Sequence, residues 1–452
     1  MESLDTTILN TAVPAIAQAL GVAPLSMKAV LASYTLSVAV FIPISGWMAN
    51  RFGTRRVFAS AIGVFTLGSF LCGLSRNIHL LVMFRILQGC GGAMMLPVGR
   101  LTLVRTFPKS ELIRAMSFVA IPGLIGPMLG PVAGGFIIAY FHWNVIFFLN
   151  IPIGLAGLWM VHRHLPNYSA TTNHPLDIVG LVLFGAGVAL LSYVLEVFGE
   201  HTLSGREMAG LLAIAAALLG AYGLHSTRIA HPLLQLALLR IRTFRGAVSG
   251  SFFTRLGIGG IPFLLPLLYQ VGFGFTAIQS GLLLMPQALA AMSLKLAMPR
   301  ILERFGYRRV LIANTLALGA MILVLSQFER TTPVWLIVLV VFTMGFFQSL
   351  QYTSMNSLAF ADIGEEQASA ASTIASTMQQ MSISFGVATA SLATAFFIPN
   401  RFAISSSEMI HGLHLAFVAL GAWTMLSTTV FRSLRDDDGE AVSRHHSAAA
   451  AG

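Results

Sequence analysis

Two ionisable side chains, Asp5 and Arg85, occur inside long apolar stretches of the sequence, where a charge needs a specific reason. A carboxylate that moves between wet and dry surroundings can gain and lose a proton. Desolvation favours its neutral form, and a nearby arginine favours its charged form. The pair is therefore a candidate for proton coupling, with Asp5 as the proton carrier and Arg85 as its partner. A hydrogen-bonded structural aspartate and a structural ion pair are the alternatives.

Other polar side chains within apolar stretches are candidates for lining a path through the protein. Gln88 follows Arg85 by three residues and shares its face of a helix, and Arg100 lies about 60° away around the same helix. Arg100 could instead extend to the cytoplasmic surface, and the amides of the second half could instead join neighbouring helices. The candidate cavity residues are Asn10, Gln88, Arg100, Arg255, Gln348, Gln351, Tyr352, Gln379 and Gln380.

The composition indicates which elements must position these residues. Of the 452 residues, 56% are hydrophobic and only 10% are charged, whereas soluble proteins carry about 25% charged residues. The apolar runs are about 20 residues long and do not alternate with polar residues, which favours helices over a barrel. The sequence therefore predicts an all-α membrane protein with about fourteen transmembrane helices.

A short basic motif, Arg-Phe-Gly-x-Arg-Arg-Val, occurs at 51–57 and again at 304–310. The first copy joins the second and third predicted helices, and the second copy joins the tenth and eleventh. This offset predicts two related six-helix bundles with two extra helices inserted between them. The predicted parts are an N-terminal bundle (1–162), two extra helices with an amphipathic inner linker (163–244), a C-terminal bundle (245–431) and a disordered cytoplasmic tail (432–452).

The net charge of +10 comes from arginines that lie mostly in short turns between apolar stretches. Such turns are typical of cytoplasmic loops, so no nucleic-acid partner is expected. The same bias places both copies of the motif and both termini on the cytoplasmic side.

Four stretches resemble motifs of the major facilitator superfamily. Residues 46–56 resemble its loop motif, 85–92 its fourth-helix arginine motif, and 123–135 its fifth-helix antiporter motif. Residues 4–14 are similar to the first-helix motif of the 14-helix drug:proton antiporter subfamily, of the EmrB/QacA type, within which the chain most resembles the MdtD-like multidrug exporters.

The resemblance implies a major facilitator fold in a bacterial cytoplasmic (inner) membrane. It also implies multidrug:proton antiport by alternating access, with two bundles rocking around a midplane cavity. The family carries Asp where this chain has Asn50, and its first helix is longer than the stretch 1–20, which is expected to be too short to span comfortably. The second copy of the loop motif has an acid, Glu303, at the matching position.

A charge relay at the loop motif and a bent, small-faced fifth helix are the gating elements that the resemblance implies. Glycines let neighbouring backbones approach closely, which suits a hinge; plain close packing is the alternative. The conformational-gating residues are Gly46, Asn50, Arg51, Gly53, Arg55, Arg56, Gly126, Pro127, Gly130, Pro131, Gly134, Gly135, Glu303, Arg304 and Gly306.

The charges leave two hypotheses open for the substrate. The resemblance implies lipophilic cations. The intramembrane cations Arg85, Arg100, Arg255 and Lys295 face one firm acid, Asp5, and such a balance should attract anions. Export of a small organic anion, a carboxylate or its metal chelate, is therefore the second hypothesis.

Other classes of function receive little support. A sensor needs an output domain, a channel would show no proton dependence, and a membrane enzyme would need a nucleophile–base set or a metal cluster. No P-loop is present, so ATP drive is not expected. The expected partners are the lipid bilayer, protons and a small-molecule substrate. The protein is expected to act as a monomer without a cofactor or metal.

Overall fold

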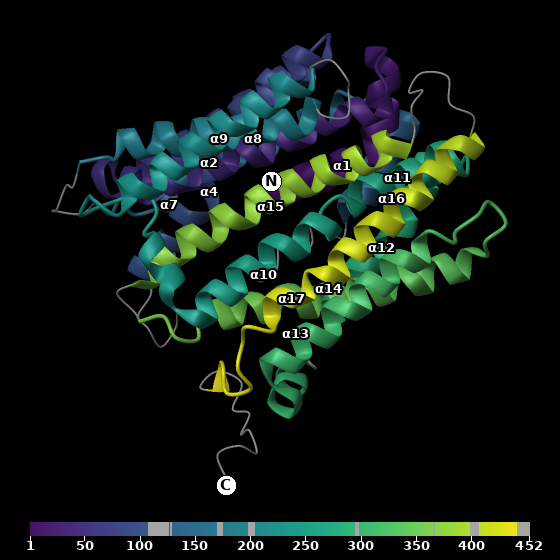
Figure 1. Ribbon diagram of the computed structural model, residues 1–452. Coiled ribbons are helices and arrows are strands. Elements are labelled where there is room, and N and C mark those ends of the chain that lie inside the picture. Colours follow the sequence, from purple (N-terminus) through teal and green to yellow (C-terminus); the bar gives the residue numbers. More distant parts are fainter. Residues whose placement is uncertain are drawn as a thin grey trace, which may run out of the picture. The chain divides into compact units, whose positions relative to one another are not determined.

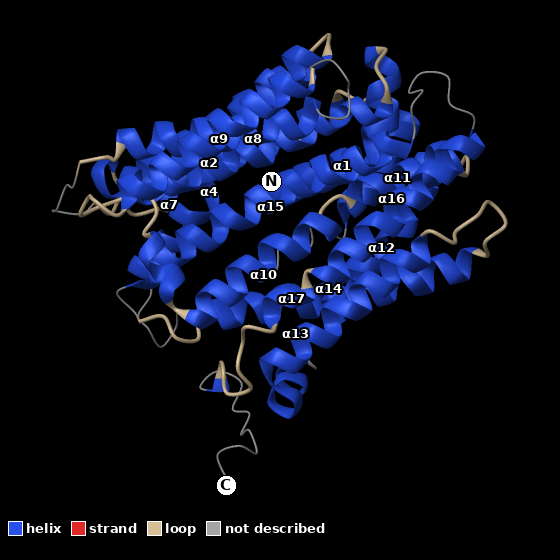
Figure 2. Cartoon of the chain, viewed as in Figure 1, coloured by secondary structure: helices blue, strands red, loops and turns tan. Residues whose placement is uncertain are grey.

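The computed structural model describes residues 1–106, 126, 129–169, 175–197, 204–293, 298–364, 367–397 and 406–440. Pro127 and Lys295 lie outside these residues. All the regular structure in the described ranges is helical (Figures 1 and 2). Ten segments of the described residues are long and apolar enough to cross a membrane. The prediction of an all-α membrane protein is confirmed.

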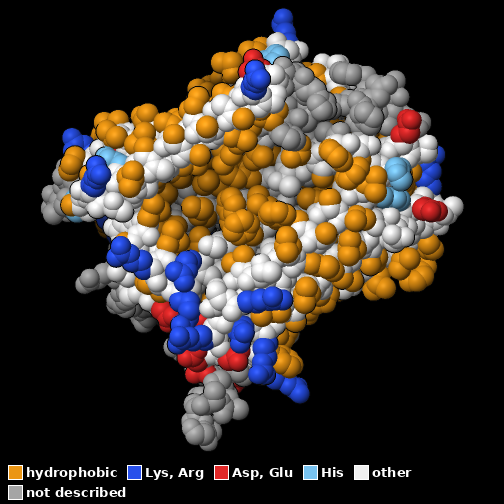
Figure 3. All heavy atoms as spheres, viewed as in Figure 1, with side chains coloured by type: hydrophobic (Ala, Val, Ile, Leu, Met, Phe, Trp, Pro, Cys, Tyr) orange, Lys and Arg blue, Asp and Glu red, His pale blue; other side chains and the backbone are white. Residues whose placement is uncertain are grey.

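The surface supports the same conclusion. Large hydrophobic side chains are exposed along the helices, among them Leu155, Trp159 and Met160. Figure 3 shows hydrophobic side chains over much of the visible face, with charged side chains gathered near helix ends. Lipid rather than water is the solvent in which such a surface is stable.

The described residues fall into two compact units: Met1–Leu234 with Thr276–Gly281, and Gln235–Phe275 with Leu282–Gly452. The first unit holds α1 (Glu2–Leu20), η1 (Pro24–Met27), α2 (Lys28–Phe52), α3 (Thr54–Gly73), α4 (Ile78–Thr106), the helical stretch Leu129–Tyr140, α6 (Val145–Phe148), α7 (Asn150–His164), α8 (Ile178–Val197) and α9 (Gly205–Ser226). The second holds η3 (Leu236–Arg240), α10 (Arg242–Ile258), α11 (Ile261–Leu267), the π-helical turn η4 (Leu268–Gly272), α12 (Ala277–Ser293, whose first residues belong to the first unit), α13 (Met298–Leu325), α14 (Val334–Ala359), α15 (Ala368–Phe397), α16 (Ser406–Leu426) and α17 (Thr428–Phe431).

The inserted helices α8 and α9 pack against each other, and α8 packs on α2. Asp177, just before α8, accepts hydrogen bonds from His225 Nε2 (2.8 Å) and from the backbone N–H groups of Gly180 (2.7 Å) and Leu233 (3.1 Å). Burial alone would raise the pKa of Asp177, but these donors hold it below its ordinary value. The carboxylate thus ties the end of α9 and the following linker to the start of α8.

The repeated motif has the same backbone role in both copies. Gly53 lies between α2 and α3 with φ +90°, and Gly306 interrupts α13 with φ +71°. Residues with a side chain rarely adopt these angles, so each copy needs its glycine. The helix α2 continues through Arg51 and Phe52 of the first copy and leaves Gly53 as the whole turn.

The prediction of a disordered tail is wrong for its first residues. Asp438 accepts hydrogen bonds from Nε and Nη2 of Arg242, and Asp436 accepts one from Arg308 Nη1 at 3.0 Å. Two-pronged pairing of arginine with a carboxylate is strong enough to order a short polar segment. The end of the predicted inner linker forms the 3-10 turn η3, and α10 begins two residues after it, at Arg242.

Candidate functional site

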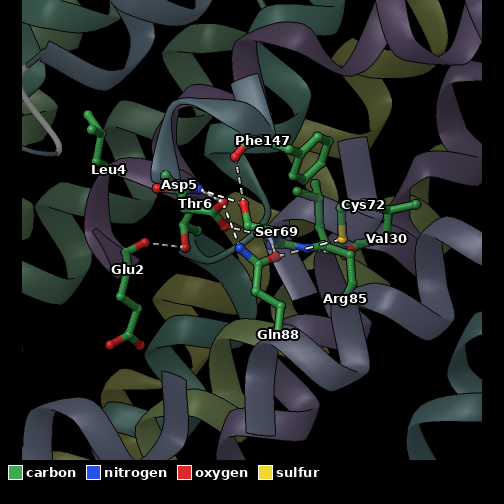
Figure 4. Close-up of polar contacts among 12 residues, drawn as sticks. Glu2, Leu4, Asp5, Thr6, Val30, Ser69, Cys72, Arg85, Gln88 and Phe147 are labelled. Atoms are coloured by element: carbon green, nitrogen blue, oxygen red, sulfur yellow. Dashed lines mark hydrogen bonds and ion pairs between the residues drawn. The ribbon is translucent and has the colours of Figure 1, made fainter. Parts of the chain in front are cut away.

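The Asp5 carboxylate, on α1, is buried among nitrogen donors (Figure 4). Its Oδ2 accepts a hydrogen bond from Arg85 Nη1 at 2.5 Å. Its Oδ1 accepts hydrogen bonds from Gln88 Nε2 at 3.0 Å and from Asn150 Nδ2 at 2.8 Å. Every one of these contacts requires an accepting oxygen, so the geometry fits the ionised carboxylate.

Arg85, on α4, is fully buried and held on several sides. Its guanidinium lies 4.3 Å from the ring centroid of Tyr34, and its Nε donates to the backbone oxygen of Val30 at 3.4 Å. A buried arginine is stable in a membrane helix only with such partners. Nη2 has no hydrogen-bond partner among the described residues.

Gln88 joins the two charged groups. Its Oε1 accepts from Arg85 Nη1 at 2.8 Å while its Nε2 donates to Asp5. Arginine can only donate and a carboxylate can only accept, so this orientation of the amide is chemically forced. Gly68 of α3 faces the backbone of Gln88, where a β-carbon would come within 2.7 Å, and this close approach sets the position of α4 against α3.

Asn150, which is not among the residues predicted from the sequence, brings α7 into the site. Asn150 is buried, and its Nδ2 also donates to Ser69 Oγ at 3.0 Å. Ser69 in turn donates to the backbone oxygen of Phe147 at 2.8 Å (Figure 4). The available signal was an amide within an apolar stretch, but nothing in the local sequence shows that it contacts a residue 145 positions earlier.

Three glycines of the fifth-helix motif, Gly126, Gly130 and Gly134, pack on α1, the helix that carries Asp5. A β-carbon at Gly130 would overlap the side chain of Thr7, and one at Gly134 would lie 2.6 Å from the backbone oxygen of Ile8. Gly126 accepts a hydrogen bond from Thr7 Oγ1 at 3.2 Å. These glycines let α1 approach closely, as a sliding or hinged contact requires.

The same stretch has a second close contact within its unit. Gly135 lies against the backbone of Ala277, and the backbone of Pro131 lies against Gly281. The small residues therefore allow close packing against two segments of the first unit, α1 and residues 276–281.

Two predicted cavity residues of the first half lie outside the Asp5 cluster. Asn10 is half-buried and lies about 140° around α1 from Asp5. Arg100 is exposed near the end of α4.

The second unit has a polar cluster around Arg255 of α10. Arg255 is 5% exposed, and its guanidinium lies 3.6 Å from the ring centroid of Tyr352 on α14. Its Nε donates to Ser251 Oγ at 3.1 Å. Gln348 donates to Tyr352 Oη at 3.1 Å and accepts from Gln287 Nε2. No carboxylate pairs with Arg255 within the part of the chain that the structure describes.

The remaining amides are placed differently. Gln351 is buried against α13, where it accepts from Asn314 Nδ2 at 2.7 Å and donates to Thr315 Oγ1 at 2.8 Å. This network joins two helices, as the alternative interpretation proposed. Gln379 and Gln380 are half-buried on α15.

At the first loop motif, Asn50 of α2 contacts α4. Arg105 Nη2 donates to Asn50 Oδ1 at 2.8 Å, so the guanidinium is bound by a neutral amide and not by a carboxylate. Asn167, after α7, accepts from the backbone N–H of Arg55 at 3.1 Å and lies directly over Gly53.

The other residues of the two motifs are mostly at the surface. A β-carbon at Gly46 would meet open space, so no close approach requires this glycine. The charged residues Arg51, Arg55, Arg56, Glu303 and Arg304 are exposed.

The helices and the buried pair define a multi-pass membrane transporter. The family model described as "Major Facilitator Superfamily" matches residues 1–387. The chain belongs to the major facilitator superfamily.

The relatives and solved structures agree with this assignment. Proteins named multidrug resistance protein MdtD are 38% identical in Klebsiella pneumoniae (strain 342), over 97% of this chain and 93% of theirs, and 39% identical in Serratia proteamaculans (strain 568), over 98% and 95%. Among solved structures, the D-xylose-proton symporter has a TM-score of 0.68 at 15% identity, covering 97% of this chain and 95% of its own. The POT family transporter PepTSo has a TM-score of 0.67 at 15% identity, covering 95% of each chain. The predicted major facilitator fold is confirmed.

Proposed function

We propose that this protein is a proton-coupled exporter, a multidrug:proton antiporter of the bacterial inner membrane that works by alternating access. The observation that carries the proposal is the Asp5 carboxylate, which is buried, surrounded by hydrogen-bond donors and paired with a fully buried arginine, Arg85. Burying an acid within a membrane costs free energy that an apolar side chain would not cost. An acid at such a position therefore points to a function. Relatives named for multidrug resistance support export as the direction of transport.

The pair couples proton binding to helix packing. In the ionised state Asp5 holds α1 to α4 through Arg85 and Gln88. Protonation neutralises the carboxylate and turns one oxygen into a donor, which no longer suits the guanidinium. The attraction between α1 and α4 then weakens, and the glycines that face Thr7 and Ile8 allow α1 to shift. Proton entry thereby favours one conformation and proton release the other.

The orientation follows from the distribution of charge. Both loop motifs carry clustered arginines, and the positive-inside rule assigns them, with both termini, to the cytoplasm. The bacterial source of the relatives supports the inner membrane. Proton entry from outside would then drive cargo outward.

A second candidate function, export of a small organic anion, is favoured by Arg255. Its charge is buried against Tyr352 and Ser251 without a described carboxylate. A substrate carboxylate would supply the missing counter-charge, whereas a cationic drug would be repelled. The two candidates share the Asp5 proton step and differ in cargo.

Dye uptake into liposomes reconstituted with the purified protein, under an imposed proton gradient, tests both proposals. We expect uptake of ethidium for the multidrug function, or of carboxyfluorescein for the anion function, and collapse of the proton gradient should abolish it. Transport that persists after collapse would refute proton coupling. Arg255→Gln should selectively reduce carboxyfluorescein transport if the anion function is correct; equal losses for both dyes would count against it.

A further inference from the structure

We propose that Asn150 is a positioning residue for the proton step at Asp5. Its side-chain amide fixes Oδ1 of the carboxylate, leaves Oδ2 as the oxygen that takes the proton, and sets the pH at which it does so. The inference deepens the proposed function and rests on the role of Asp5 in it.

The hydrogen bonds decide which oxygen is available. A carboxylate has about four acceptor positions, two on each oxygen. Both positions on Oδ1 are filled by N–H donors, Gln88 at 3.0 Å and Asn150 at 2.8 Å. Among the described residues, Oδ2 receives one donor, Arg85 at 2.5 Å. A proton on Oδ1 would have to displace an amide, whereas no described donor fills the second position on Oδ2.

Asn150 lies on a different helix from the other two donors to Asp5. Arg85 and Gln88 both belong to α4, so among the described residues Asn150 is the donor that links Asp5 to a different helix, α7. An amide can donate to a neutral carboxylic acid as well as to a carboxylate. Asn150 therefore keeps its contact when the proton arrives, while the contact with Arg85 weakens.

The neighbours of Asn150 hold it in place. The second hydrogen of its amide is used by Ser69 Oγ at 3.0 Å, and Ser69 is itself anchored on the backbone of Phe147. One turn later, a β-carbon at Gly154 would overlap Thr66 of α3, so α7 lies tightly against that helix. The amide is thus preorganised and does not need to rearrange to reach Asp5.

Other titratable groups influence the same carboxylate, and a test must separate them from Asn150. The titratable groups around Asp5 are Glu2, Tyr34, Cys72 and Arg85, and the N-terminal amine lies near Glu2. A substitution at Asn150 leaves all of these in the chain. It removes one hydrogen bond that is stronger to the ionised carboxylate than to the neutral acid, so its loss favours the protonated form.

Infrared difference spectroscopy of the full chain in lipid measures this directly without a substrate. The stretching band of the protonated Asp5 carboxyl is identified as the band that Asp5→Asn removes, and its amplitude is followed against pH. We expect Asn150→Leu, close in size and without a donor, to move the midpoint upward by about one pH unit. Asn150→Ala should move the midpoint in the same direction. Asn150→Gln, which retains the amide donor, should shift the midpoint less than Asn150→Leu does.

Asn314→Leu is the matched control, because Asn314 is also buried and bonds a side chain, Gln351, in the other unit. It should leave the Asp5 midpoint unchanged. A wild-type midpoint in both Asn150→Leu and Asn150→Ala overturns the proposal, as does an equal shift in Asn314→Leu or the absence of a titrating Asp5 band. Dye transport that ignores the proton gradient would instead refute the proposed function, so the two failures are distinguishable.

Discussion

Removing both partners of the buried pair should cost less stability than the sum of the costs of removing each alone. In Asp5→Asn the new amide can still accept from Gln88 and Asn150 through its oxygen, but its NH₂ group then faces the donor Nη1 of Arg85. The arginine is fully buried and loses its counter-charge. Breaking a buried ion pair in this way costs about 3–5 kcal/mol.

The double variant Asp5→Asn with Arg85→Gln removes the unpaired charge as well. We expect it to recover at least ~2 kcal/mol relative to the sum of the single changes, because residues in direct contact couple strongly. Reversible unfolding in detergent micelles, measured for the wild type, both single variants and the double variant, gives the coupling free energy. Additive effects within ~0.5 kcal/mol would refute the reasoning, since they would mean that the two charges do not stabilise each other in the folded protein.

Three further predictions concern the loops. Gly53→Ala and Gly306→Ala should each destabilise the protein by about 1–2 kcal/mol in thermal unfolding, because both glycines have positive φ; an unchanged midpoint for either would contradict the shared backbone role. Asn50→Asp should strengthen the contact with Arg105 into an ion pair and slow the labelling of a cysteine introduced beside this loop motif, whereas Asn50→Ala should speed it; identical labelling rates would exclude a relay there. Because the pKa of Asp177 is lowered in the folded protein, its contribution to the free energy of unfolding is full above the ordinary aspartate pKa and is lost as the pH falls through the lowered pKa. Asp177→Asn should remove this part of the loss of stability in acid. An unchanged curve of stability against pH would refute the prediction.

Much of the architecture follows from local properties of the sequence. Apolar runs of membrane length predict the helices because backbone groups in lipid must bond within their own segment. The repeated motif predicted equivalent turns, and the positive φ of Gly53 and Gly306 gives that repetition a physical meaning. The tail was misjudged because polar composition alone does not reveal that Asp438 meets Arg242.

The candidate site was predictable where charge forced it. An acid and an arginine in apolar stretches need partners, and the structure pairs Asp5 with Arg85. Neighbours far apart in sequence carried no such signal, so Asn150 was not found. Gln348 and Gln351 are three residues apart on α14, yet one joins the Arg255 cluster and the other packs on α13. Only the packing of helices against one another separates their roles.

The central claim is that the proton exchanged during transport binds to Asp5. The most direct measurement is proton release from the purified full chain in weakly buffered detergent solution when ethidium or carboxyfluorescein is added. The wild type should release protons with whichever probe is transported, and Asp5→Asn that still binds the probe should release none. Equal proton release from Asp5→Asn would contradict it.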